Sequence, residues 1–325
     1  MRSAPPFRES CRVNFLRILL DLVRGALIGV VEIIPGVSGG TVALIVGIYE
    51  RLIESLSEFL RGIARFVVDV LRGRGLAAAG AHFGRVDWRL VIPVVIGMGI
   101  ALLTAARVVA PLVDEHPVEA RALFAGLIIV ALFVPARMVG WPWRAHEWAL
   151  AVVAAVAGFV ISGLPPASSD APALPLVAVA GAFAVCALVL PGLSGSFVLL
   201  VIGVYEPTLA ALNDRDYGYL AVFMLGMVIG LAVFVQVLRW LLRRHHRITL
   251  AIMTGLMAGS LRALWPWQGG DRELLAPSGE VLPVALWFLL GAVIVVTMLI
   301  AGRVIERRAG ARIDSRGSAS TRRGS

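Results

Sequence analysis

The sequence contains no lysine, so arginine supplies all 30 of its Lys and Arg residues, against 21 acidic residues. Charged residues make up only 16% of the chain, whereas 59% of it is hydrophobic and the mean hydropathy is +0.87. A water-soluble fold of 325 residues cannot bury that much apolar surface, so the composition indicates a polytopic membrane protein. Exclusive use of arginine fits phosphate binding, because the guanidinium group binds phosphate in a bidentate manner, but a GC-rich genome is the simpler explanation.

Features typical of enzymes and metalloproteins are missing as well. The two cysteines, Cys11 and Cys186, lie in a tail and in an apolar segment, which argues against a disulfide framework and a metal site. The chain has no nucleophile elbow, no Walker loop and no metal-ligand spacing, and its five histidines fall in predicted loops (His82, His116, His146, His245 and His246). We therefore predict no catalytic residue, no metal, no cofactor and no nucleic-acid partner, and we do not expect an enzyme.

What the chain does contain is a motif that occurs twice. Nine residues are identical at a constant offset of 156 without a gap. The first copy runs from Pro35-Gly36-Val37-Ser38-Gly39-Gly40-Thr41 to Gly47-Ile48-Tyr49-Glu50, and the second from Pro191-Gly192-Leu193-Ser194-Gly195-Ser196-Phe197 to Gly203-Val204-Tyr205-Glu206. Membrane segments broken at matching places in two halves are typical of transporters built from a repeat.

The apolar stretches fall into two kinds. Six of them are long enough to cross the bilayer: 90–113, 120–136, 147–164, 218–238, 249–267 and 281–302. The regions 18–55 and 173–212 are apolar but interrupted by the motif, and only about ten apolar residues precede Pro35, enough for about half of the hydrocarbon thickness. We predict that each of these regions is a re-entrant hairpin with its tip at the Pro-Gly pair (Pro35-Gly36 and Pro191-Gly192), from which helices 41–54 and 197–210 would start.

Three crossings in each half make the second half inverted relative to the first. Further identities, among them Gly97 with Gly226 and Gly126 with Gly255, recur at an offset of 129, and the two offsets differ by 27 residues, which indicates an insertion near 61–87. We predict an all-α membrane protein with a cytoplasmic tail at 1–14, which has no cleavable signal site, a first inverted repeat at 15–164, a second at 173–302 and a basic disordered cytoplasmic tail at 303–325. Apolar residues at helical spacing predict an interfacial helix on the inner leaflet at about 61–75.

The distribution of arginine predicts the orientation in the membrane. The loops 114–119 and 165–172 have no arginine and the loop 268–280 is mostly acidic, whereas 56–89, 137–146 and 239–248 are rich in arginine. The positive-inside bias therefore places both termini in the cytoplasm.

The motifs are the candidate binding site. The first amide groups of the helices that begin at the two tips are unpaired donors at the positive end of a helix dipole, and Ser38 and Ser194 are natural N-caps. We predict that they bind a phosphate or a carboxylate through two sets of residues: Ser38, Gly39, Gly40 and Thr41, and Ser194, Gly195 and Ser196. The alternative is that each Pro-Gly pair only kinks a packing helix.

A few charged residues within apolar sequence complete the predicted site. Glu32 is a candidate for proton coupling or, alternatively, a structural partner of an arginine such as Arg24. Arg262 is a candidate countercharge for phosphate or, alternatively, a side chain that extends to the outer headgroups. The residues that end the two hairpins are candidates for coupling or gating or, alternatively, interfacial anchors: Tyr49, Glu50, Tyr205 and Glu206.

The segments 32–41, 190–197 and 259–267 resemble those of the bacterial PopT-type polyprenyl-phosphate transporters, formerly a membrane domain of unknown function. The resemblance extends over roughly residues 15–305. It implies a flippase of the bacterial cytoplasmic membrane that returns undecaprenyl phosphate from the outer to the inner leaflet for cell-wall synthesis. Its expected partners are the polyprenyl phosphate, membrane lipids and a coupling proton or cation. A carrier of a small soluble anion, using the same helix termini, is the alternative.

Overall fold

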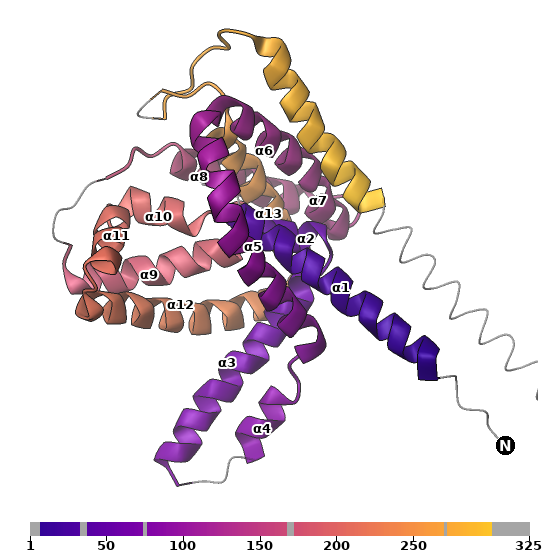
Figure 1. Cartoon of the computed structure of the whole chain (residues 1–325), viewed down its shortest axis with the longest axis vertical. Coiled ribbons are helices and arrows are strands. Elements are labelled where there is room, and N and C mark those ends of the chain that lie inside the picture. The colour runs from indigo at the N-terminus through magenta and orange to yellow at the C-terminus, as the bar shows by residue number, and fades with distance from the viewer. Residues whose placement is uncertain (1–6, 33–37, 74–76, 168–171, 270–271, 301–325) are drawn as a thin grey trace, which may run out of the picture.

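The computed structural model describes residues 7–32, 38–73, 77–167, 172–269 and 272–300, and within these ranges the chain is almost entirely helical (Figure 1). The sole β-pairing that it shows there is an isolated antiparallel bridge between Gln268 and Leu274. The predicted tip Pro35-Gly36 and the predicted tail 303–325 lie outside the described residues. Helix formation begins at Phe7, inside the segment that the sequence predicted to be a tail.

In the described residues of the first half there are eight helices: α1 (Phe7–Glu32), α2 (Gly39–Ile45), α3 (Tyr49–Leu71), α4 (Ala77–Phe83), α5 (Trp88–Glu115), α6 (Pro117–Ala131), α7 (Phe133–Val139) and α8 (Ala145–Ser162). The second half contains α9 (Leu174–Val189), α10 (Gly195–Ile202), α11 (Tyr205–Asn213), α12 (Tyr217–Arg244), α13 (His246–Ser260) and the 3₁₀ helix η1 (Leu261–Leu264). A last helix, Val281–Ile300, follows the loop after η1.

Four of these helical segments are long and apolar enough to cross a membrane: Pro117–Val139, which joins α6 and α7, then α8, α12 and Val281–Ile300. They correspond to four of the six predicted spans, and they make the chain a polytopic helical membrane protein. The predicted span 90–113 lies in α5, whose strongly apolar part is Trp88–Thr104. The predicted span 249–267 lies in α13, which ends at Ser260 after 15 residues and continues only as a 3₁₀ turn.

Each motif contains a second helix break, at a glycine that follows the Pro-Gly pair. The backbone of Gly47 has φ = 74° and that of Gly203 has φ = 82°, in the left-handed region that glycine adopts without steric cost. At the second glycine, α10 and α11 meet at an angle of 103°. The expectation of continuous helices over 41–54 and 197–210 was therefore wrong. After Gly47 the chain restarts as α3, a single helix of 23 residues that also contains most of the predicted interfacial helix.

Equivalent glycines hold equivalent helix pairs together in the two halves. A Cβ atom on Gly97 would lie 2.0 Å from the carbonyl oxygen of Leu22, so α1 and α5 touch along their backbones. A Cβ atom on Gly226 would lie 2.0 Å from the carbonyl oxygen of Ala178, so α9 and α12 do the same. Gly226 and Ala178 are the counterparts of Gly97 and Leu22 at the offsets of 129 and 156. Such matched contacts are what a structural repeat requires, and the inversion of the halves in a membrane stays a prediction.

The largest apolar core surrounds the first motif. Val42, Leu44 and Ile48 are buried there together with Leu250 and Met253 of α13. The far part of α3 leaves this core and, with α4 beside it, forms an arm that projects from the other helices (Figure 1). The first motif is thus fixed in the centre of the molecule, and the arm is joined to it by the short turn at Gly47.

Candidate functional site

Side chains of the first motif contact backbone groups of the second motif and of the residues just before it. The hydroxyl oxygen of Ser38 lies 3.0 Å from the carbonyl oxygens of both Leu188 and Leu190. The hydroxyl oxygen of Thr41 accepts a hydrogen bond of 3.1 Å from the amide of Gly192. Ser38 and Thr41 are fully buried in this contact. The structure therefore brings together the two broken segments that the sequence predicted to form one site.

The amino terminus of α2 is occupied by groups of its own chain. Glu32, the last residue of α1, accepts a hydrogen bond of 2.8 Å from the amide of Gly39. Ser38 acts as the N-cap and accepts a hydrogen bond of 3.2 Å from the amide of Gly40. The carboxylate of Glu32 thus takes the place where the sequence predicted a bound anion. An external phosphate that uses these amides has to displace it.

The second tip is arranged differently. Pro191 and Gly192 form a buried turn after α9, with φ = 89° at Gly192, and α10 begins at Gly195. The hydroxyl groups of Ser194 and Ser196 hydrogen-bond to each other at 2.9 Å. No carboxylate is available at the position that matches Glu32, because that residue is Leu188.

The residues that end the two motifs also have unequal surroundings. The hydroxyl group of the buried Tyr49 donates a hydrogen bond of 3.1 Å to the carbonyl oxygen of Val189, which adds a third link between the motifs. Glu50 lies 2.8 Å from His246 at the surface. Tyr205 packs against the core of the second half, and Glu206 is exposed. Tyr49 is therefore a bridging residue, and its counterpart Tyr205 is a packing residue.

Arg262 lies in η1 against the carboxyl-terminal end of α8. Its guanidinium group stands over the ring of Phe159, 4.7 Å from the ring centre, and fills the space beside Gly163. Its buried Nε atom has no hydrogen-bond partner among the described residues. Arg262 forms no ion pair with a described carboxylate. In the described part of the chain, the side chain of Arg262 is held by its contacts with Phe159 and Gly163.

Two further arginines, Arg121 and Arg272, were not predicted from the sequence. Arg121 donates a hydrogen bond of 3.3 Å to the carbonyl oxygen of Pro266, which follows η1. The guanidinium group of Arg272 lies 4.2 Å from the centre of the Phe197 ring, at the start of α10. Burial and the charge of Arg121 lower the pKa of Arg272. The sequence could have pointed to both arginines, because they occur on the side of the membrane that was predicted to be poor in arginine.

A large apolar groove opens beside the first motif. It has a volume of about 1650 Å³ and is bounded by α1, the carboxyl-terminal end of α2, α6, α7, α8, α13 and the helix Val281–Ile300. Its lining residues Phe133, Trp141 and Val152 are 64%, 80% and 57% exposed, so the groove is open along one side. Its charged lining residues are Arg24, which pairs with Asp21 at 2.8 Å, and Arg137.

The groove and the contact between the motifs are connected through α2. Leu44 and Ile45 at the end of this helix line the groove, whereas Thr41 near its start contacts Gly192 of the second motif. At 1.5 Å per residue, seven residues separate the two by about 10 Å. A ligand with an apolar body in the groove therefore lies one short helix away from the contact between the motifs.

The structure defines a helical membrane protein, and its broken helices that meet in the core are features found in transporters. A family model described as VCA0040-like, undecaprenyl phosphate translocase-like, matches residues 28–282. The chain belongs to this undecaprenyl phosphate translocase-like family, which confirms the family resemblance of its motifs.

Two relatives support the assignment. The chain is 35% identical to a polyprenyl-phosphate transporter of Vibrio cholerae over 269 residues, which cover 83% of this chain and 84% of the relative. It is 25% identical to a polyprenyl-phosphate transporter of Staphylococcus aureus over 301 residues, covering 87% of this chain and 94% of the relative. No solved structure matches the chain at a significant level.

Proposed function

We propose that this protein moves a polyprenyl phosphate, and specifically undecaprenyl phosphate, across the bacterial cytoplasmic membrane from the outer to the inner leaflet. Both relatives are named polyprenyl-phosphate transporters, and the family is described by undecaprenyl phosphate translocation. The lipid returned in this way would be reused as a carrier in cell-wall synthesis. The family and the names of the relatives indicate a transporter rather than an enzyme.

The observation that carries this proposal is the open apolar groove. A polyprenyl tail has to stay in an apolar medium while its head crosses, and the groove of about 1650 Å³ offers such a path along its open side. A carrier of a small soluble anion, which is the alternative, would need a closed cavity that excludes lipid. The exposed positions of Phe133, Trp141 and Val152 along the groove favour the lipid.

The phosphate head would meet a different set of groups on each side of the membrane. On the outer side, Arg121, Arg262 and Arg272 together with Ser194, Gly195 and Ser196 would receive it, because a guanidinium group binds phosphate in a bidentate manner. On the inner side, Arg24 and Arg137 line the groove. Rocking of the two halves about the contact between the motifs would transfer the head from one set to the other.

Glu32 would couple this transfer to a proton. Moving a phosphate with a charge of about −1.5 to −2 toward a negative interior costs about 2.3 kcal/mol per charge per 100 mV, and a proton moving with it offsets part of that cost. The carboxylate of Glu32 already accepts a hydrogen bond of 2.8 Å from the amide of Gly39, at the position predicted for a bound anion. Protonation of Glu32 would weaken this bond and free the amides of α2 for the head of the substrate.

The function is tested by depleting the protein in a strain that has no second translocase for the same lipid. We expect undecaprenyl phosphate to accumulate at the outer surface, where an impermeant phosphatase or a lipid-binding antibiotic detects it, and re-expression should reverse the change. A normal leaflet distribution would contradict the proposal. Uptake of inorganic phosphate by liposomes that contain the purified protein would instead support the carrier of a soluble anion.

A further inference from the structure

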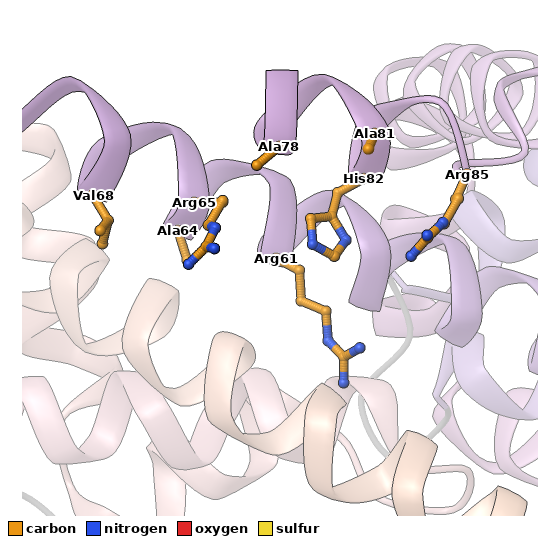
Figure 2. A pocket seen from close by; sticks show the side chains of 8 residues that line it. All are labelled: Arg61, Ala64, Arg65, Val68, Ala78, Ala81, His82 and Arg85. Carbon is orange, nitrogen blue, oxygen red and sulfur yellow. The ribbon is translucent and has the colours of Figure 1, made fainter. Parts of the chain in front are cut away.

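A basic cleft lies on the arm formed by α3 and α4, away from the groove and the motifs. It has a volume of about 520 Å³ and is lined by Arg61, Ala64, Arg65 and Val68 of α3 and by Ala78, Ala81, His82 and Arg85 of α4 and the turn after it. Figure 2 shows the arginine and histidine side chains on one side of the two helices, with Arg61 extending toward a neighbouring helix. That helix is α12, where Gln236 accepts a hydrogen bond of 2.6 Å from Arg61.

The positive charge of the cleft is not neutralised by the acid beneath it. Glu58, whose side chain is 4% exposed, lies 2.5 Å from Arg239 and 2.8 Å from His82. The same carboxylate is 3.8 Å from Arg61 and 4.0 Å from Arg85, so its shorter contacts are those with Arg239 and His82. A second buried acid, Asp69, follows Val68 on α3, and no ion pair joins it to a described cation. Among the described ion pairs, Glu58 is the sole carboxylate that meets an arginine of the cleft lining, at 3.8 Å and 4.0 Å, so the three lining arginines leave the cleft positive.

Arg65 has the clearest surplus charge. It lines the cleft from α3, it is exposed, and it forms no ion pair with a described carboxylate. Arg61 and Arg85 are 46% and 67% exposed in their side chains, so an anion can reach all three guanidinium groups from outside. Arg65 and Arg85 line the cleft with exposed guanidinium groups, and Arg61, whose Nε is bonded to Gln236, adds a third positive charge. Together they supply N–H donors and positive charge for a phosphate.

An apolar strip of α12 leads to this cleft. Ile229, Val233, Val237 and Trp240 are 54%, 62%, 48% and 56% exposed, and they lie on the same side of α12 as Gln236, which contacts Arg61. The tryptophan near the end of the helix and the arginines of its last turn place this end at the predicted cytoplasmic interface. Acyl chains along this strip would bring a lipid headgroup to the level of the cleft.

We propose that the cleft between α3 and α4 binds the phosphate of an anionic glycerophospholipid of the inner leaflet, with its acyl chains along α12. Basic pockets at the cytoplasmic ends of membrane helices have the charge that such headgroups require. The bound lipid would tie the arm to the end of α12, through Arg61 and Gln236, in addition to the direct contact between them. This site is separate from the transport path and does not depend on the proposed function.

The test is a binding measurement on the purified, delipidated full-length protein. Native mass spectrometry would follow the titration with phosphatidylglycerol and, in parallel, with zwitterionic phosphatidylcholine. We expect Arg65→Glu to weaken phosphatidylglycerol binding about tenfold and to leave phosphatidylcholine binding unchanged. Arg72→Glu is the matched control, because Arg72 lies at the exposed end of the same helix and does not line the cleft, and it should bind like the wild type.

Further arms of the experiment separate this ligand from others. The triple variant R61Q/R65Q/R85Q should lose the preference for phosphatidylglycerol, whereas R72Q/R89Q/R244Q, which removes equal charge outside the cleft, should keep it. Equal binding by Arg65→Glu and Arg72→Glu, or equal affinity of the wild type for both phospholipids, would overturn the proposal. Displacement of phosphatidylglycerol by inorganic phosphate alone or by an equimolar amount of undecaprenyl phosphate would also overturn it, because the cleft would then serve free phosphate or the transported lipid.

Discussion

The hydroxyl oxygen of Thr41 accepts a hydrogen bond from the amide of Gly192 at 3.1 Å, with both groups buried. Thr41 belongs to the first motif and Gly192 to the second, so the bond joins the halves where their broken helices meet. The contact is not symmetric, because the residue that corresponds to Thr41 is Phe197. When one half moves against the other, either this bond breaks or Thr41 and Gly192 move together.

Thr41→Val tests the contribution of that bond to stability. Valine has a similar shape but no acceptor, and the buried amide of Gly192 would lose its partner, which costs about 1–3 kcal/mol. We expect the free energy of unfolding in denaturant to fall by that amount. Thr41→Ser keeps the hydroxyl group and should retain more of the stability. Identical unfolding of Thr41→Val and the wild type would show that water replaces the bond.

The glycine contacts between helices predict that alanine destabilises the protein at one position of α5 and not at another, two residues away. A Cβ atom on Gly97 would lie 2.0 Å from the carbonyl oxygen of Leu22, whereas a Cβ atom on Gly99 would have nothing within 4 Å. Gly97→Ala should therefore force α1 and α5 apart and destabilise the protein by about 1–3 kcal/mol or more. Gly99→Ala should be neutral or stabilising by about 0.5–1 kcal/mol, since alanine favours the helix. Denaturant unfolding of both variants measures the difference, and equal effects would refute the close contact.

The lowered pKa of Glu58 predicts how the stability of the folded protein depends on pH. Burial raises the pKa of this carboxyl, but the hydrogen bonds and charges of His82 and Arg239 outweigh burial and hold its pKa below the usual 4.5. A carboxyl with a lower pKa in the folded than in the unfolded protein adds stability that is complete above the unfolded pKa and is lost as the pH falls through the folded pKa. The wild type should therefore lose stability as the pH falls below 4.5. In Glu58→Gln, which is less stable at neutral pH, the thermal midpoint should change less over the same range; an equal acid dependence would exclude this role.

Glu32→Gln separates the coupling role of Glu32 from its structural role. The amide oxygen of glutamine can still accept the hydrogen bond from Gly39, so we expect the variant to insert and fold normally. It cannot bind or release a proton, so transport should stop or lose its dependence on pH and on the proton gradient. Glu115→Gln, which changes an exposed carboxylate at the end of α5, is the control. A wild-type rate and pH profile in Glu32→Gln would leave Glu32 as a structural cap of α2.

Local signals in the sequence were sufficient for the class of the protein and for the helix break at the second Pro-Gly pair. The paired motifs predicted an interruption at each Pro-Gly pair, and α9 does end just before Pro191. The same signals failed at Gly47 and Gly203, which were treated as helical. A glycine is compatible with a helix as well as with a left-handed turn, and packing in the folded protein decides between them. Sequence alone therefore could not fix the bend between α10 and α11.

The parts of the site that sequence did not reveal come from segments far apart in the chain. Arg121 and Arg272 lie in α6 and in the loop after η1, and each looks like an ordinary interfacial arginine in its own segment. The groove is formed by parts of seven helices, and no single helix shows it as a pattern. The bond from Gly39 to Glu32 is a similar case, because the sequence predicted the helix terminus and the carboxylate but not that one would occupy the other.

The central claim, that a polyprenyl phosphate crosses along the groove, is tested most directly by two valines of α8. Val152 lines the groove, and Val153 is 65% exposed without lining it. The measurement is hydrolysis of undecaprenyl phosphate in liposomes by an externally added, impermeant phosphatase. Without transport, only the lipid of the outer leaflet is hydrolysed.

With the wild type and with Val153→Trp, we expect the whole pool to become accessible to the phosphatase. With Val152→Trp, whose indole ring projects into the groove and narrows it, the pool of the inner leaflet should stay protected. Hydrolysis of the whole pool by the correctly folded Val152→Trp protein, at the rate seen with Val153→Trp, would contradict the assignment of the groove as the path of the lipid.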